Sequence, residues 1–333
     1  MSDAEPLVDP SPRRSGWLAV GVSTLVVAWA MVIVILVRVF GDRWWVGTLV
    51  LFSPRWLLLA PLVLGAFVWP WCGRWTRWSL LAAAAISWWG VSGFCVPLSG
   101  WVAKPKMVYR ILTCNVAGTL VDTLALETLI ADSRADIVVL QEYTASGAVT
   151  FPDSWSSEQR GNLLIASRFP LLHARVVTRD LPDRSPRPVA VVAELVSPER
   201  RLRIGTLHLL SPSHGLSQVV DPRTIIDVSQ RGILTVETTR RGSESRRVAD
   251  FVGTQPDSIV VAGDFNMPVE SYFFRTHWRS FRDAFEATGM GFGNTCFVRK
   301  GGIPFGARID HVLTRGNWHT LRCRVGPDVG SDH

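Results

Sequence analysis

The sequence predicts an α/β domain, built from two packed β-sheets with helices on their outer faces, that follows a helical membrane region. The 333-residue chain changes composition near residue 103. Before this point it is apolar and rich in tryptophan, and after it short apolar runs recur between polar turns. Several of these runs end in polar residues. The second part, about 225 residues, has the size of a single domain.

The first part has the composition of a membrane anchor. Residues 17–103 contain one acidic residue, five arginines and twelve of the fifteen tryptophans. The apolar run 17–38 is long enough to cross a bilayer core, and further spans are predicted over 52–71 and 79–101. Tryptophans cluster near the ends of these spans, where their rings favour the interface. Because Pro54-Arg55 interrupts the middle segment, two spans are the alternative to three.

The anchor prediction has consequences for topology. A cleaved signal peptide does not fit, since the first apolar run is too long and two more follow it. Basic residues lie on both sides of the predicted spans, so charge alone does not orient the chain. Three spans would give a cytoplasmic tail over residues 1–16, an anchor over 17–103 and an extracytoplasmic domain. The net charge of +7 suits an anionic membrane surface or an anionic substrate.

The second part contains many predicted strands and few predicted helices. Runs such as "DIVVLQE" and "SIVVAGDFN" have cores of Val, Ile and Leu between polar residues, which is typical of buried strands. Helices are predicted over 119–134 and about 243–252. Polar side chains stand at the strand ends: Asn115, Gln141, Glu142, His208, Asp264, Asn266 and Asp310. Each alone could be an ordinary turn residue, but together they indicate one site, which Asp332 and His333 would complete.

The residue types in this set suggest a chemistry. Carboxylates with an amide oxygen suit a hard cation such as Mg²⁺ or Mn²⁺. The five cysteines have no zinc-type spacing, and neither a phosphate-binding Gly-rich loop nor a G-x-S-x-G elbow is present. A hard cation in a site with histidines and amides indicates phosphate ester hydrolysis by a metal-assisted water.

The ordered motifs resemble a known family. "LTCNV", "VVLQE", "NLLIASRFPL", "IGTLHLLSP", "VVAGDFNMP", "RIDHVL" and "GSDH" resemble the endonuclease/exonuclease/phosphatase superfamily, which includes DNase I-like nucleases. The resemblance covers about residues 107–333 and implies a four-layer α/β sandwich with the site at one edge of the paired sheets. In the family pattern an apolar strand follows the Ser-Asp-His triplet. We therefore expect the domain over 107–333 to lack its last strand and the intact protein to continue.

The resemblance also implies roles in metal binding. Glu142 would be the principal Mg²⁺ ligand, with Asn115 and Asp332 near the metal.

The resemblance further implies catalytic roles. Asp264 would activate the attacking water, which Asn266 would help to hold. His208 would contact the phosphate. His333 would stabilise the transition state, with its ring fixed by Asp310.

The layout of anchor and domain resembles membrane-bound bacterial members linked to glycopeptide resistance. It implies a multi-pass enzyme of the cell membrane acting on a lipid phosphate or polyprenyl pyrophosphate, with the bilayer as a partner. One alternative is a surface nuclease. Another is a non-catalytic ligand-binding membrane module, which the complete motif set argues against. The arginine runs 199–203 and 240–247 could bind phosphates, but they are interpreted as solvated faces unless they border the site. His173, His277, His311 and His319 are interpreted as surface or packing residues.

Overall fold

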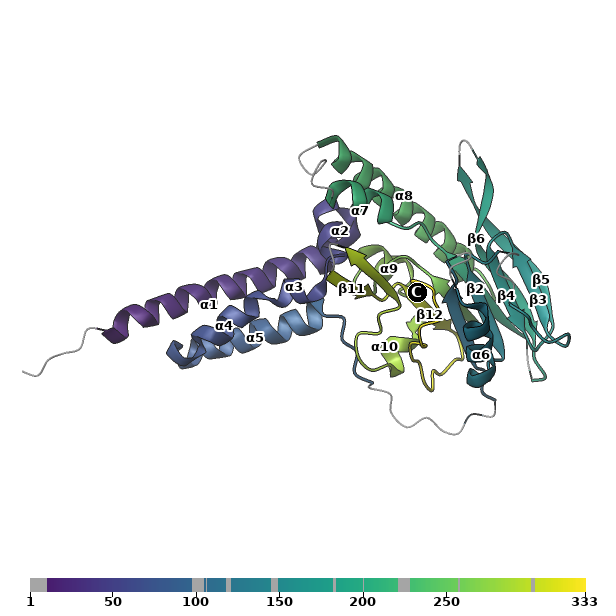
Figure 1. Ribbon diagram of the computed structural model, residues 1–333, viewed down its shortest axis with the longest axis horizontal. Coiled ribbons are helices and arrows are strands. Elements are labelled where there is room, and N and C mark those ends of the chain that lie inside the picture. The colour runs from purple at the N-terminus through teal and green to yellow at the C-terminus, as the bar shows by residue number, and fades with distance from the viewer. Residues whose placement is uncertain are drawn as a thin grey trace, which may run out of the picture.

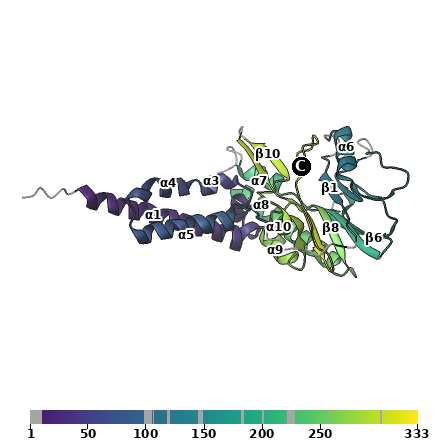
Figure 2. The ribbon, with the colours of Figure 1, turned by 90° about the horizontal axis from the view of Figure 1, so that it is seen from below.

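A computed structural model of the chain describes residues 11–97, 105, 107–117, 121–144, 149–181, 184–199, 201–220, 228–256, 258–300 and 303–333. A group of helices from the first part projects from an α/β domain formed by the second part (Figure 1). The helices extend from the same side of the domain in a view turned by 90° (Figure 2). The described helices of the first part end at Val91, and the first strand of the second part begins at Ile111.

The projecting helices run side by side. Helix α1 (Ser11–Ile35) continues through a π turn (Leu36–Phe40) and a 3₁₀ turn (Gly41–Arg43), and is followed by α2 (Trp45–Leu51). Then come α3 (Arg55–Leu59), α4 (Pro61–Val68), a 3₁₀ turn (Trp69–Trp71) and α5 (Arg74–Val91). Small and branched residues of α1 pack against α4 and α5, and Ala19, Val26 and Leu80 form a buried cluster. The outer faces are apolar, with Trp17, Phe67 and Trp75 each more than 70% exposed.

The structure supports only part of the predicted span pattern. Among the described residues, one continuous helical segment, Gly16–Arg43, is long and apolar enough to cross a membrane. A second candidate requires α2 to be joined with Arg55–Trp71, and the two are bent by 100° at the break, where Pro54-Arg55 stands. Helix α5 ends at Val91, so it starts earlier and stops earlier than the predicted span 79–101. Residues 98–101 of that span lie outside the described residues.

The domain contains the two mixed sheets that the sequence predicts. One has the order β1-β2-β4-β3 and the other β5-β6-β7-β8-β12-β9, with a separate β10-β11 hairpin. The bounds of the first sheet are β1 Ile111–Asn115, β2 Ile137–Gln141, β3 Ser156–Arg160 and β4 Leu163–Ser167. Those of the second are β5 Leu171–Leu181, β6 Arg184–Val196, β7 Arg201–His208, β8 Ile259–Asp264, β9 Arg282–Asp283 and β12 Asp310–Arg315. The hairpin strands are β10 Cys296–Lys300 and β11 Ile303–Ala307.

Alternating side chains of each strand fill different cores. In β2, Ile137 and Val139 face the second sheet, whereas Val138 and Leu140 face helix α6 (Thr123–Ser133). Both faces of the strand are buried, which explains its uninterrupted apolar run. On the far side of the second sheet, Val248 and Val252 of helix α8 (Val228–Gly253) join a third core. Helix, sheet, sheet and helix form the four layers.

The domain helices differ in extent from those predicted. Helix α6 begins later than the predicted 119–134 because Asp122 caps it, accepting a hydrogen bond from the N–H of Ala125. Helix α8 begins at Val228, well before the predicted 243–252. Its early turns carry mostly polar side chains, so the apolar periodicity showed only its last turns. The shorter helices are α7 Ser213–Val220, α9 Tyr272–His277 and α10 Ala284–Thr288.

The end of the helical region that lies next to the domain is bonded to the residues that lead into helix α9. Asp42, which is fully buried, accepts a hydrogen bond of 2.6 Å from the hydroxyl of Ser271. Arg55 forms a 3.0 Å ion pair with the buried carboxylate of Glu270. This segment follows the strand end at Asp264, so the helical region contacts the part of the domain next to the predicted site.

Candidate active site

Three predicted site residues form one row across the second sheet. The strand register places Asp264 of β8 opposite His208 of the parallel strand β7 and opposite Asp310 of the antiparallel strand β12. His208 Nε2 lies 3.4 Å from Asp264 Oδ2. The register alone therefore brings together two carboxylates and an imidazole that lie up to about 100 positions apart in the sequence.

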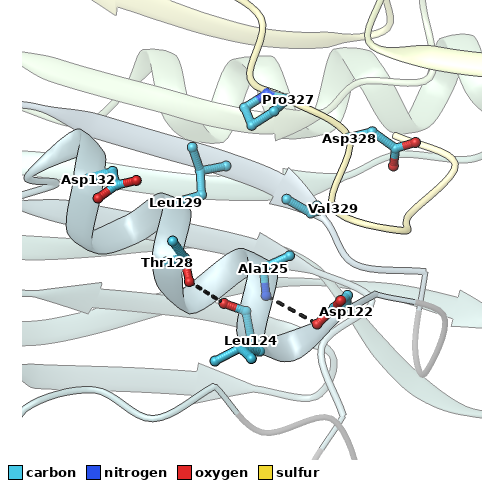
Figure 3. A pocket seen from close by; sticks show the side chains of 9 residues that line it. All are labelled: Asp122, Leu124, Ala125, Thr128, Leu129, Asp132, Pro327, Asp328 and Val329. Carbon is cyan, nitrogen blue, oxygen red and sulfur yellow. Dashed lines mark hydrogen bonds between the residues drawn. The ribbon is translucent and has the colours of Figure 1, made fainter.

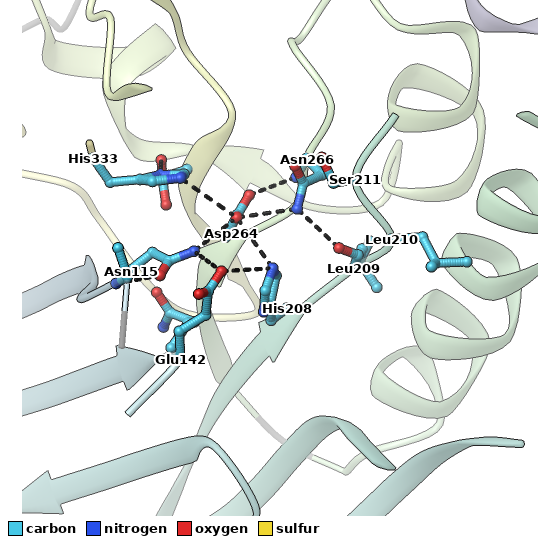
Figure 4. A network of polar contacts seen from close by, with 12 residues as sticks. Asn115, Glu142, His208, Leu209, Leu210, Ser211, Asp264, Asn266 and His333 are labelled. Carbon is cyan, nitrogen blue, oxygen red and sulfur yellow. Dashed lines mark hydrogen bonds and ion pairs between the residues drawn. The ribbon is translucent and has the colours of Figure 1, made fainter. Parts of the chain in front are cut away.

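The first sheet supplies the other side of the site. Asn115 and Gln141 are paired at the ends of β1 and β2. Asn115 Nδ2 donates to Asp264 Oδ2 and to Glu142 Oε1, each at 3.1 Å, as Figure 4 shows. The buried Gln141 side chain donates to the hydroxyl of Thr206 in the second sheet at 2.9 Å. These bonds fix the two sheets to each other at the edge where the polar residues meet.

Special backbone conformations direct the side chains at the strand ends. Glu142 and Asn266 both have positive φ, of 54° and 51°, which is uncommon for residues other than glycine. Gly263 has a φ of 148°, and a Cβ there would lie 2.3 Å from the carbonyl oxygen of Leu207. Only glycine fits at this position. The sharp turn that follows lets the Asp264 carboxylate accept hydrogen bonds from the backbone N–H (2.8 Å) and the side-chain amide (3.0 Å) of Asn266.

His333 is oriented by a carboxylate. Its Nδ1 lies 2.8 Å from Asp310 Oδ2, and its Nε2 lies 3.9 Å from Asp264 Oδ2. Asp310 Oδ2 also accepts a 2.6 Å bond from the hydroxyl of Thr295. The segment leading to His333 is held in place as well, since the Ser331 hydroxyl donates to the carbonyl oxygen of Asn115 at 2.6 Å.

The charges of these groups affect one another strongly. Burial and the charge of Asp310 raise the pKa of the Asp264 carboxyl to about 8. Burial would lower the pKa of His333, but hydrogen bonds with Asp310 and Cys296 and the nearby carboxylates raise it to about 12. Burial lowers the pKa of His208. At neutral pH the site therefore combines the cationic imidazole of His333, the neutral imidazole of His208 and the carboxyl of Asp264, whose pKa lies close to this pH.

The donor set fits a divalent cation. Even with Asp264 protonated, the carboxylates of Glu142, Asp310 and Asp332 outnumber the single imidazole with a raised pKa, so negative charge is in excess. The Glu142 side chain is 41% exposed, which leaves it accessible. Among the described residues, two groups of three ligand atoms lie within 4.8 Å of one another: Asp264, Asp310 and His333, and Cys296, Asp332 and His333. Oxygen donors predominate, as hard cations require.

The structure brings most of the predicted site residues into one network. Asn115, Glu142, His208, Asp264, Asn266, Asp310 and His333 are linked by the contacts above. Asp332 lies beside Cys296 and His333, and Glu142 belongs to neither group of three. Glu142 and Asp332 thus do not share one such group of ligand atoms, and the role of Asn115, Glu142 and Asp332 in metal binding stays a prediction.

Several contributors escaped the sequence analysis. Thr295 and Cys296 do not follow any strand that the sequence predicts. They lie fifteen and fourteen residues before Asp310, which is enough chain to lead back to the site.

The interpretation of run 240–247 as solvated is wrong for Arg241, which is 1% exposed. His311 is a packing residue as predicted, since it is buried and bonded to Asp283 at 2.7 Å.

An open groove of about 400 Å³ lies elsewhere, between α6 and residues 327–329. Figure 3 shows Asp122, Asp132 and Asp328 at its rim. None of the predicted site residues lines it. The polar network at the strand ends, and not this groove, is therefore the candidate active site.

Comparisons with solved structures find several similar chains. The chain is similar to the 3'-5' exonuclease NExo from Neisseria meningitidis, with 19% identity, coverage of 62% of this chain and 86% of that chain, and a TM-score of 0.44. It is similar to D. rerio TDP2 complexed with single strand DNA product, with 18% identity, coverage of 62% and 84%, and a TM-score of 0.45. An endonuclease/exonuclease/phosphatase family protein from Leptotrichia buccalis has 14% identity, coverage of 66% and 90%, and a TM-score of 0.43. No curated protein matches the chain.

A family model decides the assignment. The model described as the Endonuclease/Exonuclease/phosphatase family matches residues 112–333, about two thirds of the chain. The match begins in β1 and includes every strand end that contributes to the polar network. The chain belongs to the endonuclease/exonuclease/phosphatase family and is a metal-dependent phosphoric ester hydrolase.

Proposed function

We propose that the protein is a membrane-anchored, Mg²⁺-dependent phosphoesterase that hydrolyses a phosphate ester or pyrophosphate of a lipid or polyprenyl carrier. The proposal of hydrolysis rests on one network of hydrogen bonds. In it, Asn115 Nδ2 donates to both Asp264 and Glu142, beside the Asp310–His333 pair. It combines a carboxyl able to accept a proton with an oriented cationic imidazole.

In this proposal Asp264 and Asn266 hold the attacking water. The carboxyl of Asp264 has a pKa raised to about 8 by burial and by Asp310, so near neutral pH it can accept the proton of that water. The imidazolium of His333, oriented by Asp310, donates to a phosphoryl oxygen as negative charge develops in the transition state. His208, whose pKa is lowered by burial, is a neutral donor to the same phosphate.

The proposed cation is Mg²⁺, with Mn²⁺ as a substitute. Glu142, Asn115 and Asp332 would hold it. When bound, it neutralises phosphoryl oxygens and lowers the barrier to attack by water. The exposed Glu142 carboxylate and the excess of negative charge in the site support this assignment.

The anchor supports a substrate held in the bilayer. We propose that residues 17–103 form the anchor, because α1, α3–α4 and α5 lie side by side with apolar outer faces (Figure 1). Residues 1–16 and the catalytic domain would then lie on opposite sides, with the domain extracytoplasmic. The contacts of Asp42 and Arg55 with residues 270 and 271 keep the site near the domain end of the anchor. Reporter fusions after Ser2 and Val329 test the topology, and equal cytoplasmic signals would contradict it.

A substrate panel tests the function. The full chain in detergent micelles is assayed with Mg²⁺ or EDTA on polyprenyl pyrophosphate, phosphoinositide, sphingomyelin, plasmid DNA and RNA, with Asp264→Asn as the inactive control. We expect Mg²⁺-dependent hydrolysis of a lipid substrate that the control lacks. Hydrolysis of nucleic acid alone would contradict the lipid proposal.

The net charge of +7 favours a second candidate, a surface nuclease. A polyanion would be attracted by this charge, and its binding would weaken steeply with salt as phosphate contacts are lost. The salt dependence of KM in the same panel separates the candidates. A lipid in a mixed micelle should show a much shallower dependence than a nucleic acid.

A further inference from the structure

Side chains of helix α8 form hydrogen bonds with backbone groups of the segment that follows His208. Glu237 Oε2 accepts the N–H of Gly215 at 2.7 Å, and Glu244 Oε1 accepts the N–H of Leu210 at 2.8 Å. Arg241 Nε donates to the carbonyl oxygen of Leu210 at 3.1 Å. These three side chains are spaced four and three residues apart, so they share one face of the helix. Both backbone groups of Leu210, two residues after His208, therefore bond to α8.

Arg241 also reaches the other catalytic loop. Its Nη2 donates to the carbonyl oxygen of Asn266 at 2.7 Å. Asn266 stands two residues after Asp264, as Leu210 does after His208, so one guanidinium joins equivalent points of two neighbouring strand ends. The Asn266 side chain completes the connection by donating to the carbonyl oxygen of Leu209 at 2.9 Å. In Figure 4 Leu209, Leu210 and Asn266 lie together next to His208 and Asp264.

The surroundings of the guanidinium make this link rigid. Arg241 is 1% exposed, and its Nη1 has no hydrogen-bond partner among the described residues. The ring of Phe52, from the helical region, lies 5.4 Å from the Arg241 Cζ. The flat guanidinium offers two donors in fixed directions, which a lysine ammonium cannot reproduce. A buried charge is costly unless it is hydrogen-bonded and compensated, and here the two carbonyl oxygens and the nearby carboxylates of Glu237 and Glu244 offset this cost.

We propose that Arg241 is a positioning residue for hydrolysis: it fixes the left-handed Asn266 and the loop after His208 relative to each other. It thereby holds the Asn266 amide against the Asp264 carboxylate, which the strand register already places opposite His208. The proposal rests on the hydrolase activity of the family and not on the lipid substrate. Loss of the bridge would let the two loops separate. A displacement of about 1 Å at a catalytic group can reduce the rate by ~10²-fold.

The test compares Arg241→Met with Arg240→Met in the full chain. Both substitutions remove an arginine at adjacent positions of α8, but Arg240 is exposed. With bis(4-nitrophenyl) phosphate and Mn²⁺, we expect kcat of Arg241→Met to fall by ~10²-fold with little change in KM, because the contacts to substrate remain. Arg240→Met should match the wild type. Mn²⁺ affinity, measured by titration calorimetry, should stay unchanged in both variants.

Two further variants separate positioning from general destabilisation. Arg241→Lys keeps the buried charge but cannot bond both carbonyls in the same plane, so it should fold and still lose most of kcat. In Arg241→Ala, millimolar methylguanidinium should restore part of kcat without raising the melting temperature in proportion. Wild-type kcat in a folded Arg241→Lys or Arg241→Met would overturn the proposal. A recovery of kcat in Arg241→Ala that only parallels a rise in its melting temperature would also overturn the proposal.

Discussion

Asp264 has five polar neighbours, and they do not all act on its charge in the same direction. Burial and Asp310 favour the neutral carboxyl, whereas His333, the N–H of Asn266 and the amide of Asn115 favour the carboxylate. The result is a pKa raised to about 8, far above the ordinary value near 4. A group that titrates close to working pH is suited to accept a proton from water.

The raised pKa of Asp264 predicts how the rate of hydrolysis depends on pH. A general base works when deprotonated, so kcat/KM should rise with pH along a limb whose apparent pKa lies above the ordinary aspartate value and at or below about 8. In Asp264→Asn, kcat should fall by ~10²–10⁴-fold, KM should barely change, and the limb should vanish. Initial rates across pH measure both. A loss confined to KM would show that Asp264 serves binding instead.

Glu142 makes a separate prediction about the metal. Its carboxylate is partly exposed and bonded to Asn115, so Glu142→Gln keeps the shape and the hydrogen bond while removing the charge. Hydrolysis should drop to background, and calorimetry should show Mn²⁺ affinity reduced by at least about tenfold. The control is Glu199→Gln, at an exposed position outside the site. Unchanged turnover in Glu142→Gln would remove this residue from the proposed site.

At the scale of elements, the strands could be predicted well and the helices less well. Apolar runs that end in polar residues predicted the positions of β1, β2, β7, β8 and β12. Strands that are buried on both faces have an uninterrupted run of apolar residues, which is visible in the sequence. Helix α8 was underestimated because its inner face uses Glu237, Arg241 and Glu244, which in sequence look like solvated charges. Their buried contacts are with loops far along the chain. No local pattern could have shown them.

One element, α10, offers a test of stability. Asp283 caps it, accepting hydrogen bonds from the N–H groups of Phe285 and Glu286, and also bonds His311. Asparagine would still cap the helix but would lose the charged partner of His311. We expect Asp283→Asn to lower the free energy of unfolding by roughly 1.5–3 kcal/mol. Asp122→Asn, at an exposed cap of α6, should change it by only a few tenths.

The same variant has a pH signature. Burial would raise the pKa of Asp283, but the hydrogen bond and charge of His311, with Arg308, hold it below its ordinary value. A depressed carboxyl pKa stabilises the fold fully above the unfolded pKa near 4, and this stabilisation is lost as pH falls through the folded pKa. The difference between wild type and Asp283→Asn in denaturant titrations should therefore be constant at neutral pH and shrink below about pH 4. A difference that grows on acidification would contradict the assignment.

At the scale of the whole molecule, the helical region and the domain meet through buried polar contacts. Asp42 bonds the Ser271 hydroxyl, Arg55 pairs with Glu270, and Arg275 donates to the carbonyl oxygen of Arg38. The ring of Phe292 packs edge-on against Trp88. Such contacts have defined geometry, unlike an apolar surface that can slide. We therefore expect the two parts to unfold as a coupled unit.

The Arg55–Glu270 pair allows this coupling to be measured. The side chains are 18% and 3% exposed, so removing one leaves a largely buried charge without its partner, which costs about 3–5 kcal/mol. Arg55→Met and Glu270→Gln should each lower the melting temperature of the detergent-solubilised full chain. The double variant should lose clearly less than the sum of the two, because neither charge is then stranded. Glu286→Gln, at a half-exposed carboxylate of α10, is the control and should have little effect. If the helical region were an independent tether, the two single effects would simply add, and tryptophan fluorescence of the helices and activity of the domain would be lost at different temperatures.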